Sequence, residues 1–215
     1  EAFIERFPNL EAIAAATEDE VVALWSGLGY YRRARLLYRL AREVVAMGGG
    51  LPGTADRLAE LPGIGPYTAA AVASMVHGEA VPVLDGNVAR VGARVLAIVG
   101  DPRRQPGRDE ILAWVGEMVS SAEPGEVNEA LMELGATVCR PIGPRCEACP
   151  LAACCRACAE GDAEAFPPPR RPRSPVELQW LSVLAEGRDG RWLLHRIADG
   201  PILHGLWLPP YAEIA

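Results

Sequence analysis

The chain has 215 residues, and half of them are hydrophobic, which is enough for one or two domains with a sizeable core. Its 28 acidic and 21 basic residues give a net charge of −7, which disfavours a surface that attracts nucleic acid through overall positive charge. No apolar run is long enough to span a bilayer. Every basic residue is an arginine, so no reaction step can use a lysine of this chain.

Two short helices are predicted near the start of the chain. Asn9 can cap a helix over about 10–16, because its side chain can accept a hydrogen bond from an amide of the first turn. Thr17 and Glu20 have the spacing of a capping box, which opens a second helix that ends near Trp25.

A longer helix is predicted over 31–47, where apolar residues recur at helical spacing until three glycines end it. The turn before it contains two tyrosines, Tyr30 and Tyr31. On the residues alone, both tyrosines fit a place in the core better than an exposed contact site. The helix also gathers positive charge in five arginines: Arg32, Arg33, Arg35, Arg39 and Arg42.

A glycine hairpin between two helices is predicted next. A short helix capped by Thr54 leads into Gly63, Ile64 and Gly65, where two glycines allow a tight turn with positive φ. Pro66 suits the first position of the following helix. The backbone amides of such a hairpin and helix N-terminus can bind an anion such as phosphate, but the same pattern also occurs as a plain turn.

A lone carboxylate, Asp85, ends the short apolar run that follows this helix. It can cap a helix that extends to about Val99, and a cap at the mouth of a cleft can also face a ligand. Two further helices are predicted over 107–121 and 124–139. No strand pattern occurs in this part of the sequence.

Six cysteines lie between Cys139 and Cys158, and none occurs elsewhere, which favours a metal site over dispersed disulfides. Four of them follow the pattern C-x6-C-x2-C-x5-C: Cys139, Cys146, Cys149 and Cys155. Four thiolates in a compact loop suit either a tetrahedral zinc ion or a [4Fe–4S] cluster, and the spacing alone does not decide between them. Cys154 and Cys158 fall outside the pattern, although Cys154 could replace Cys155.

The composition changes after the cysteines. The proline-rich stretch 159–175 is predicted to be an extended linker. Two apolar runs, 178–184 and 191–196, then flank a glycine turn, which predicts a β-hairpin.

The segments L-P-G-I-G-P-Y-T-A (61–69) and V-L-D-G-N-V-A-R-V (83–91) resemble the helix-hairpin-helix DNA glycosylases. Within them the chain is most similar to the MutY-type adenine glycosylases, which remove adenine mispaired with 8-oxoguanine. The resemblance implies a mainly α fold, with a glycosylase domain over 1–158 and a [4Fe–4S] cluster on the four patterned cysteines. It also implies the start of an α+β Nudix-like domain over 176–215, without the signature of a Nudix hydrolase.

The resemblance also implies roles for individual residues. Asp85 matches the family's catalytic aspartate, and Asn87 is expected to hydrogen-bond around it. Gly63, Ile64 and Gly65 match the hairpin that binds DNA, and Tyr30 matches an aromatic that wedges into the duplex beside 8-oxoguanine. Tyr67 stands where endonuclease III-type enzymes have a lysine, so a lysine imine is impossible and hydrolysis of the glycosidic bond remains.

One departure from the family concerns the general acid. The family's E-V-M-L-Q-Q-T glutamate lies on a helix before the region that matches Glu1, and Glu1 and Glu5 come too late to substitute for it. We therefore expect an internal fragment, inactive by itself, of a bacterial cytoplasmic protein. Its expected partner is double-stranded DNA with adenine opposite 8-oxoguanine or guanine, bound by a monomer. The alternatives are a DNA-binding iron–sulfur protein without catalysis and a glycosylase acting on thymine opposite guanine.

Overall fold

The structure is a computed structural model that describes residues 1–168, 177–198 and 205–214. The chain forms two compact units, Glu1–Pro169 and Arg170–Ala215. Residues 169–175 of the predicted linker lie outside the described residues. Among the described residues, no helix is both long and apolar enough to cross a lipid bilayer.

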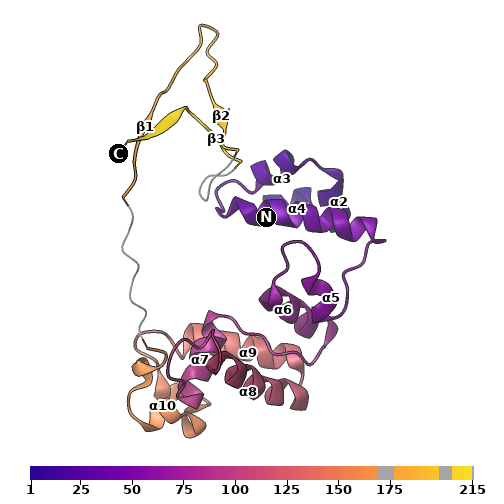
Figure 1. Ribbon diagram of the computed structural model, residues 1–215. Helices are drawn as coiled ribbons and strands as arrows, with labels where there is room; N and C mark the ends of the chain where they lie inside the picture. The colour runs from indigo at the N-terminus through magenta and orange to yellow at the C-terminus, as the bar shows by residue number, and fades with distance from the viewer. Residues whose placement is uncertain (169–176, 199–204, 215) are drawn as a thin grey trace. The chain divides into compact units, whose positions relative to one another are not determined.

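The first unit is helical, which confirms the predicted fold class (Figure 1). Its helix α1 has no counterpart among the predicted helices, because its five residues begin without a side-chain cap. In chain order the helices are α1 (Ala2–Arg6), α2 (Leu10–Ala15), α3 (Glu18–Leu24), α4 (Tyr31–Ala46), α5 (Ala55–Ala59), α6 (Pro66–His77), α7 (Gly86–Leu96), α8 (Gly107–Ser121), α9 (Pro124–Thr137) and α10 (Arg156–Ala159). Three 3-10 turns lie around α10: η1 (Cys146–Ala148), η2 (Ala152–Cys154) and η3 (Ala163–Ala165).

Local capping signals predict the starts of α2 and α3 correctly. The Asn9 side chain accepts a hydrogen bond from the amide of Ala12 at 2.9 Å. The Thr17 hydroxyl accepts from the amide of Glu20 at 3.2 Å, and the Glu20 carboxylate accepts from the amide of Thr17 at 2.8 Å. Both contacts of a capping box are therefore present.

The structure differs from the prediction in the capping group of α5 and in the end of α7. The Thr54 side chain does not cap α5; the carboxylate of Glu79, distant in sequence, accepts from the amide of Ala55 at 2.6 Å. Helix α7 ends at Leu96 rather than near residue 99, because Ala97 is left-handed, with φ 53° and ψ 48°.

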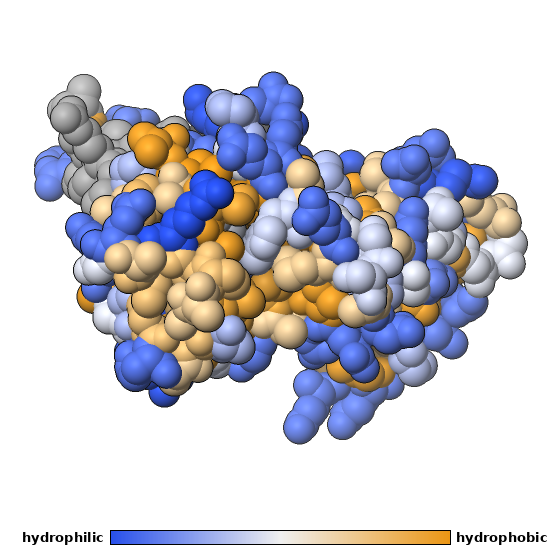
Figure 2. All heavy atoms as spheres, turned by 90° about the horizontal axis from the view of Figure 1, so that it is seen from below, coloured by the Kyte–Doolittle hydropathy of each residue, from blue (hydrophilic) through white to orange (hydrophobic). Residues whose placement is uncertain are grey.

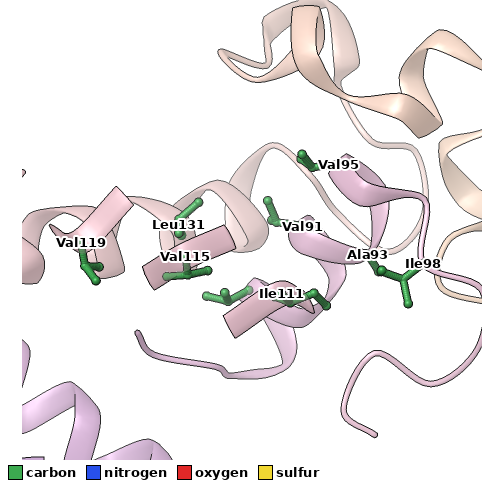
Figure 3. Close-up of a cluster of buried hydrophobic side chains, with 9 residues drawn as sticks. Val91, Ala93, Val95, Ile98, Ile111, Val115, Val119 and Leu131 are labelled. Atoms are coloured by element: carbon green, nitrogen blue, oxygen red, sulfur yellow. The ribbon is translucent and has the colours of Figure 1, made fainter. Parts of the chain in front are cut away.

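Helices α7, α8 and α9 share a core of buried aliphatic side chains (Figure 3). Val91 and Ile98 come from or follow α7, Ile111 and Val115 from α8, and Leu131 from α9. Burial of each such side chain is worth about 1.5–3 kcal/mol. This core fixes α7, and Asp85 is the residue directly before that helix.

Two smaller cores lie under the earlier helices. One joins α4, α5 and α6 through Val44, Leu58 and Ala73, and the other lies around Ile13 and Val21. Figure 2 shows patches of apolar residues between hydrophilic ones on the exposed surface.

The second unit contains short paired strands. Strand β1 (Gln179–Ser182) pairs antiparallel with β4 (Tyr211–Ile214), and β2 (His195–Arg196) pairs antiparallel with β3 (Trp207–Leu208). The rings of Trp180 and Tyr211 stack across the first pair, with centroids 4.9 Å apart.

The predicted hairpin around the glycine turn is present only at its tip. There Glu186 and Trp192 form an isolated antiparallel bridge, and the amide of Leu193 donates to the carbonyl of Ala185 at 2.9 Å. The run 178–184 itself does not pair with 191–196. Their strands pair instead with segments that follow residue 204. Neither run alternates strictly between apolar and polar residues, so the pattern does not select one partner strand over another.

Candidate functional site

Asp85 is the residue directly before α7, and its carboxylate caps that helix. Its Oδ1 accepts a hydrogen bond from the amide of Val88 at 2.7 Å, so the predicted cap is present. The carboxylate is half-buried. Within the described part of the chain, no hydrogen bond to its second oxygen is found. One oxygen is thus fixed by the helix, and the other is available to a ligand.

Asn128 on α9 holds the strand-like segment that leads into Asp85. This side chain is fully buried, at 0% exposure. Its Oδ1 accepts from the amide of Val83 at 3.0 Å, and its Nδ2 donates to the carbonyl of Val81 at 3.0 Å. A buried amide that satisfies two backbone groups fixes the segment, because breaking either bond would leave a buried polar group without a partner.

Asn87 is held from two sides. Its Oδ1 accepts from Nη2 of Arg90 at 2.9 Å. A Cβ added to Gly135 of α9 would lie only 2.6 Å from the Cβ of Asn87, so the two helices touch here. This close approach requires glycine at position 135.

Arg90 connects this site to the cysteine loop. Its Nε donates to the carbonyl of Cys139 at 2.8 Å, and its Nη2 also donates to the carbonyl of Gly135 at 2.7 Å. Burial lowers the pKa of Arg90 below the usual arginine value, while the nearby Asp85 carboxylate opposes that shift. Arg90 therefore bonds the first patterned cysteine and also interacts electrostatically with Asp85.

Tyr67 lies in the first turn of α6 and contacts α9. Its hydroxyl lies 3.7 Å from the sulfur of Met132, and the side chain is 46% exposed. Asn128, Met132 and Gly135 follow helical spacing and therefore share one face of α9. That face brings together Tyr67, the segment before Asp85, and Asn87.

The glycine hairpin packs against α4. Gly63 has φ +82°, and a Cβ there would lie 2.7 Å from the Cβ of Leu36. Gly65 does not have the positive φ that was predicted, because with φ −87° it serves as the N-cap of α6. It has no side chain to cap the helix, and Pro66 occupies the first position, as predicted. The first amides of α6 therefore have no side-chain cap.

Tyr30 is not part of the core. It is 77% exposed and left-handed, with φ 51° and ψ 48°, directly before α4. The Arg33 guanidinium lies over its ring, 4.5 Å from the centroid. The preceding turn is held by Trp25, whose Nε1 donates to the carbonyl of Gly29 at 3.0 Å. Positive φ is uncommon in a bulky residue, so the backbone at Tyr30 is strained while its side chain points into solvent.

The four patterned cysteines line one cavity after α9. Cys139, Cys146, Cys149 and Cys155 all border it. The off-pattern Cys158 borders it too, which the spacing did not predict. Burial raises the pKa of the Cys146 and Cys155 thiols. Among the described residues, no three Cys, His, Asp or Glu side chains are arranged to hold a single metal ion.

Arg94 of α7 lies between this cavity and the loop around it. It is 2% exposed, and its Nη1 lies 3.3 Å from the sulfur of Cys139. The other guanidinium contacts go to backbone carbonyls of Arg140, Pro141 and Phe166, at 2.7, 3.1 and 2.9 Å. A buried cation bonded to carbonyls and a sulfur, with no carboxylate among these contacts, favours negative charge in the cavity.

The structure thus joins some predicted residues and leaves others apart. The same face of α9 contacts Tyr67, Asn87 and the segment that leads into Asp85, and Arg90 links Asn87 to Cys139. Tyr30 and the hairpin both adjoin α4. Sequence reasoning missed Asn128, Arg90 and Arg94, because each bonds groups 45 or more residues away, although Arg90 also bonds the nearby Asn87.

Comparisons with known proteins cover most of this chain. The family model described as HhH-GPD superfamily base excision DNA repair protein matches residues 1–117. The chain is 47% identical over 157 residues to the human protein named adenine DNA glycosylase, covering 72% of this chain and 29% of that protein. It is 32% identical over 193 residues to the protein of that name from Buchnera aphidicola subsp. Acyrthosiphon pisum (strain APS), covering 89% and 55%.

Two solved structures are similar to the chain. A thermostable thymine-DNA glycosylase matches with a TM-score of 0.64 and 27% identity, covering 74% of this chain and 73% of that one. Endonuclease III in a non-covalent DNA complex matches with a TM-score of 0.61, with the same coverage. At 24% identity this second likeness shows the fold alone. The chain spans less than a third of the human protein's length and just over half of the Buchnera one.

Proposed function

The chain belongs to the HhH-GPD superfamily of base excision DNA repair proteins, and we propose that it forms the glycosylase core of an enzyme that hydrolyses the N-glycosidic bond of adenine. The substrate would be double-stranded DNA with adenine opposite 8-oxoguanine or guanine. The observation that carries this proposal is the half-buried Asp85 carboxylate, with one oxygen fixed by α7 and the other available. The curated relatives named above support adenine as the base.

In this proposal Asp85 stabilises the positive charge that develops on the sugar. The enzyme must first turn the adenine nucleotide out of the duplex, because the glycosidic bond is not accessible inside the stack. As the bond breaks, the sugar gains oxocarbenium character, and a fixed carboxylate nearby lowers the barrier. The oxygen of a water molecule then bonds to the sugar carbon, and the departing adenine takes up a proton. Since the chain contains no lysine, no imine of its own can form and the product is an abasic site.

Asn87 and Tyr67 have supporting roles in this proposal. Asn87 is oriented by Arg90 and can hydrogen-bond a substrate or water beside Asp85. Tyr67 forms a wall of the cleft, because it stands on α6 against the same face of α9.

We assign DNA contacts to the hairpin and to Tyr30. The amides around Gly63, Ile64 and Gly65, with the uncapped first turn of α6, suit a phosphate. The exposed ring of Tyr30 suits stacking against a base where the duplex opens.

Cys139, Cys146, Cys149 and Cys155 would hold a [4Fe–4S] cluster, which in this proposal stabilises the loop and its contact with DNA. The fit rests on thiols from one loop around a shared cavity and on Arg94, which directs an N–H group at the sulfur of Cys139. Hydrogen bonds to thiolate sulfurs and buried positive charge both stabilise an anionic cluster. Purified anaerobically, the protein should contain about four irons per chain; stoichiometric zinc without iron would contradict the assignment.

The test uses the full-length protein that contains this chain and a labelled duplex with adenine opposite 8-oxoguanine. Asp85→Asn keeps the helix cap, because asparagine caps as well as aspartate, but it removes the charge. We expect the single-turnover rate of adenine release to fall by at least about 10²–10³ while DNA binding persists. Strand breakage should require added base or heat. A variant that releases adenine at the parent rate would reduce Asp85 to a helix cap.

The likeness to a thymine-DNA glycosylase supports a second candidate, removal of thymine opposite guanine. The same assay with a thymine–guanine duplex separates the two. Thymine release without adenine release would replace the proposed substrate, and binding without release of either base would favour a non-catalytic DNA-binding protein.

A further inference from the structure

Five thiols, rather than four, surround the cavity after α9. Cys158 borders it together with the four patterned cysteines. Cys154, the other off-pattern cysteine, is exposed, does not border the cavity, and directs its sulfur to the carbonyl of Leu151 at 3.3 Å. Position in the fold therefore distinguishes two cysteines that the spacing leaves equivalent.

Cys158 lies close in the chain to the last patterned cysteine. It stands on α10, three residues after Cys155, which is the N-cap residue of that helix. The Cys155 thiol donates to the carbonyl of Arg94 at 3.4 Å, and both sulfur-bearing residues border the same cavity. Cys155 and Cys158 thus lie about one helical turn apart at the edge of one cavity.

We propose that Cys158 is a reserve ligand that can take the place of Cys155 on the iron–sulfur cluster. The inference rests on the cluster assigned under the proposed function. A cubane has four irons and each takes one thiolate, so one of five thiols is left over. In the exchange, the Cys158 sulfur forms a bond to iron as the Cys155 sulfur releases it. The proton of the incoming thiol passes to the departing thiolate or to water, and no oxidation state changes.

The test compares serine variants of the full-length protein, purified anaerobically, by iron and sulfide content per chain and by the electron paramagnetic resonance of the cluster after one-electron oxidation with ferricyanide. Cys155→Ser keeps an N-cap for α10, since serine is among the preferred caps. We expect this variant to retain most of its iron with an altered resonance spectrum. The double variant Cys155→Ser/Cys158→Ser should lose its iron as completely as Cys139→Ser. Cys158→Ser alone should retain the parent content.

The matched control is Cys154→Ser/Cys155→Ser, which should behave like Cys155→Ser, because Cys154 points away from the cavity. Loss of iron in Cys155→Ser as complete as in the double variant would overturn the inference. Loss in Cys158→Ser but not in Cys155→Ser would overturn it too, because Cys158 would then be the standing ligand. A parent protein without iron would instead refute the cluster itself.

A second measurement does not depend on the folding of Cys155→Ser. The parent and Cys158→Ser are exposed to a mild oxidant and an iron chelator, and the rate of iron release is followed by absorbance. With its reserve ligand removed, Cys158→Ser should release iron several-fold faster. Equal rates would overturn the inference.

Discussion

Asp85 and Tyr30 belong to the same candidate site, but Asp85 is fixed by packed helices and Tyr30 by an exposed turn. Asp85 rests on α7, whose core, buried Asn128 and close contact with Gly135 fix it from several directions. Tyr30 lies in an exposed turn, and its strained backbone and the Arg33 contact determine where its ring points. Around Asp85, substitutions should therefore change stability and function together, whereas at Tyr30 they should separate the two.

The largest expected effect is that of Asn128→Ala. It removes the partners of the Val83 amide and the Val81 carbonyl, and each orphaned buried group costs about 1–3 kcal/mol. Adenine release should also slow, because the segment before Asp85 loses its anchor. Urea denaturation and single-turnover kinetics on the same samples check both. If release slows without a change in stability, Asn128 does not act through the backbone.

Gly135→Ala should destabilise the protein by about 1–3 kcal/mol, because the new methyl group would overlap Asn87. The control is Gly116→Ala on α8, where a Cβ meets no atom within 4 Å and alanine should stabilise by about 0.4–1 kcal/mol. Thermal unfolding measures both. Equal melting temperatures for the two variants would show that α7 and α9 do not approach as closely as described.

At Tyr30 the expected effect on stability is small. Tyr30→Gly relieves the left-handed strain but adds backbone freedom to the unfolded chain, so the free energy of unfolding should change by less than about 1 kcal/mol. Discrimination in favour of 8-oxoguanine should fall nonetheless, because the stacking ring is gone. Tyr30→Phe, which keeps the ring, should behave like the parent. A large loss of stability in Tyr30→Gly would contradict the distinction between the two residues.

The smallest effect concerns the capping box at the start of α3. The Thr17 amide holds the pKa of Glu20 below its usual value, so the ionised carboxylate stabilises the folded state. That contribution is present above the ordinary glutamate pKa and is lost as the pH falls through the lowered folded-state value. Glu20→Gln should therefore remove a small part of the acid sensitivity of unfolding. An unchanged pH profile between about 3 and 5 would show that the box adds nothing measurable.

The sequence predicts contacts between residues that are close in the chain better than contacts between residues that are far apart. The caps at Asn9, Thr17 and Asp85 are contacts within three residues, and all three were predicted. Asn128 and Arg94 act on groups 45 or more residues away, and neither has a local signal.

The same limit explains the remaining errors. The run 178–184 contains β1, and its residue pattern does not indicate that β4 is its partner strand. For Tyr30 the residues alone favour the core, and only the family resemblance indicates exposure. Spacing places Cys158 outside the cysteine pattern, yet it borders the same cavity, because it lies three residues after Cys155 on α10.

The buried guanidinium of Arg94 also bears on the order in which the protein forms during synthesis. One of its backbone partners is the carbonyl of Phe166, 72 residues further along the chain. At a translation rate of roughly 5–20 residues per second, that carbonyl is made about 4–14 s after Arg94. Until then the contacts around Arg94 are incomplete, and water must complete them. The cysteine loop therefore reaches its final form only after the last segment of the first unit has emerged.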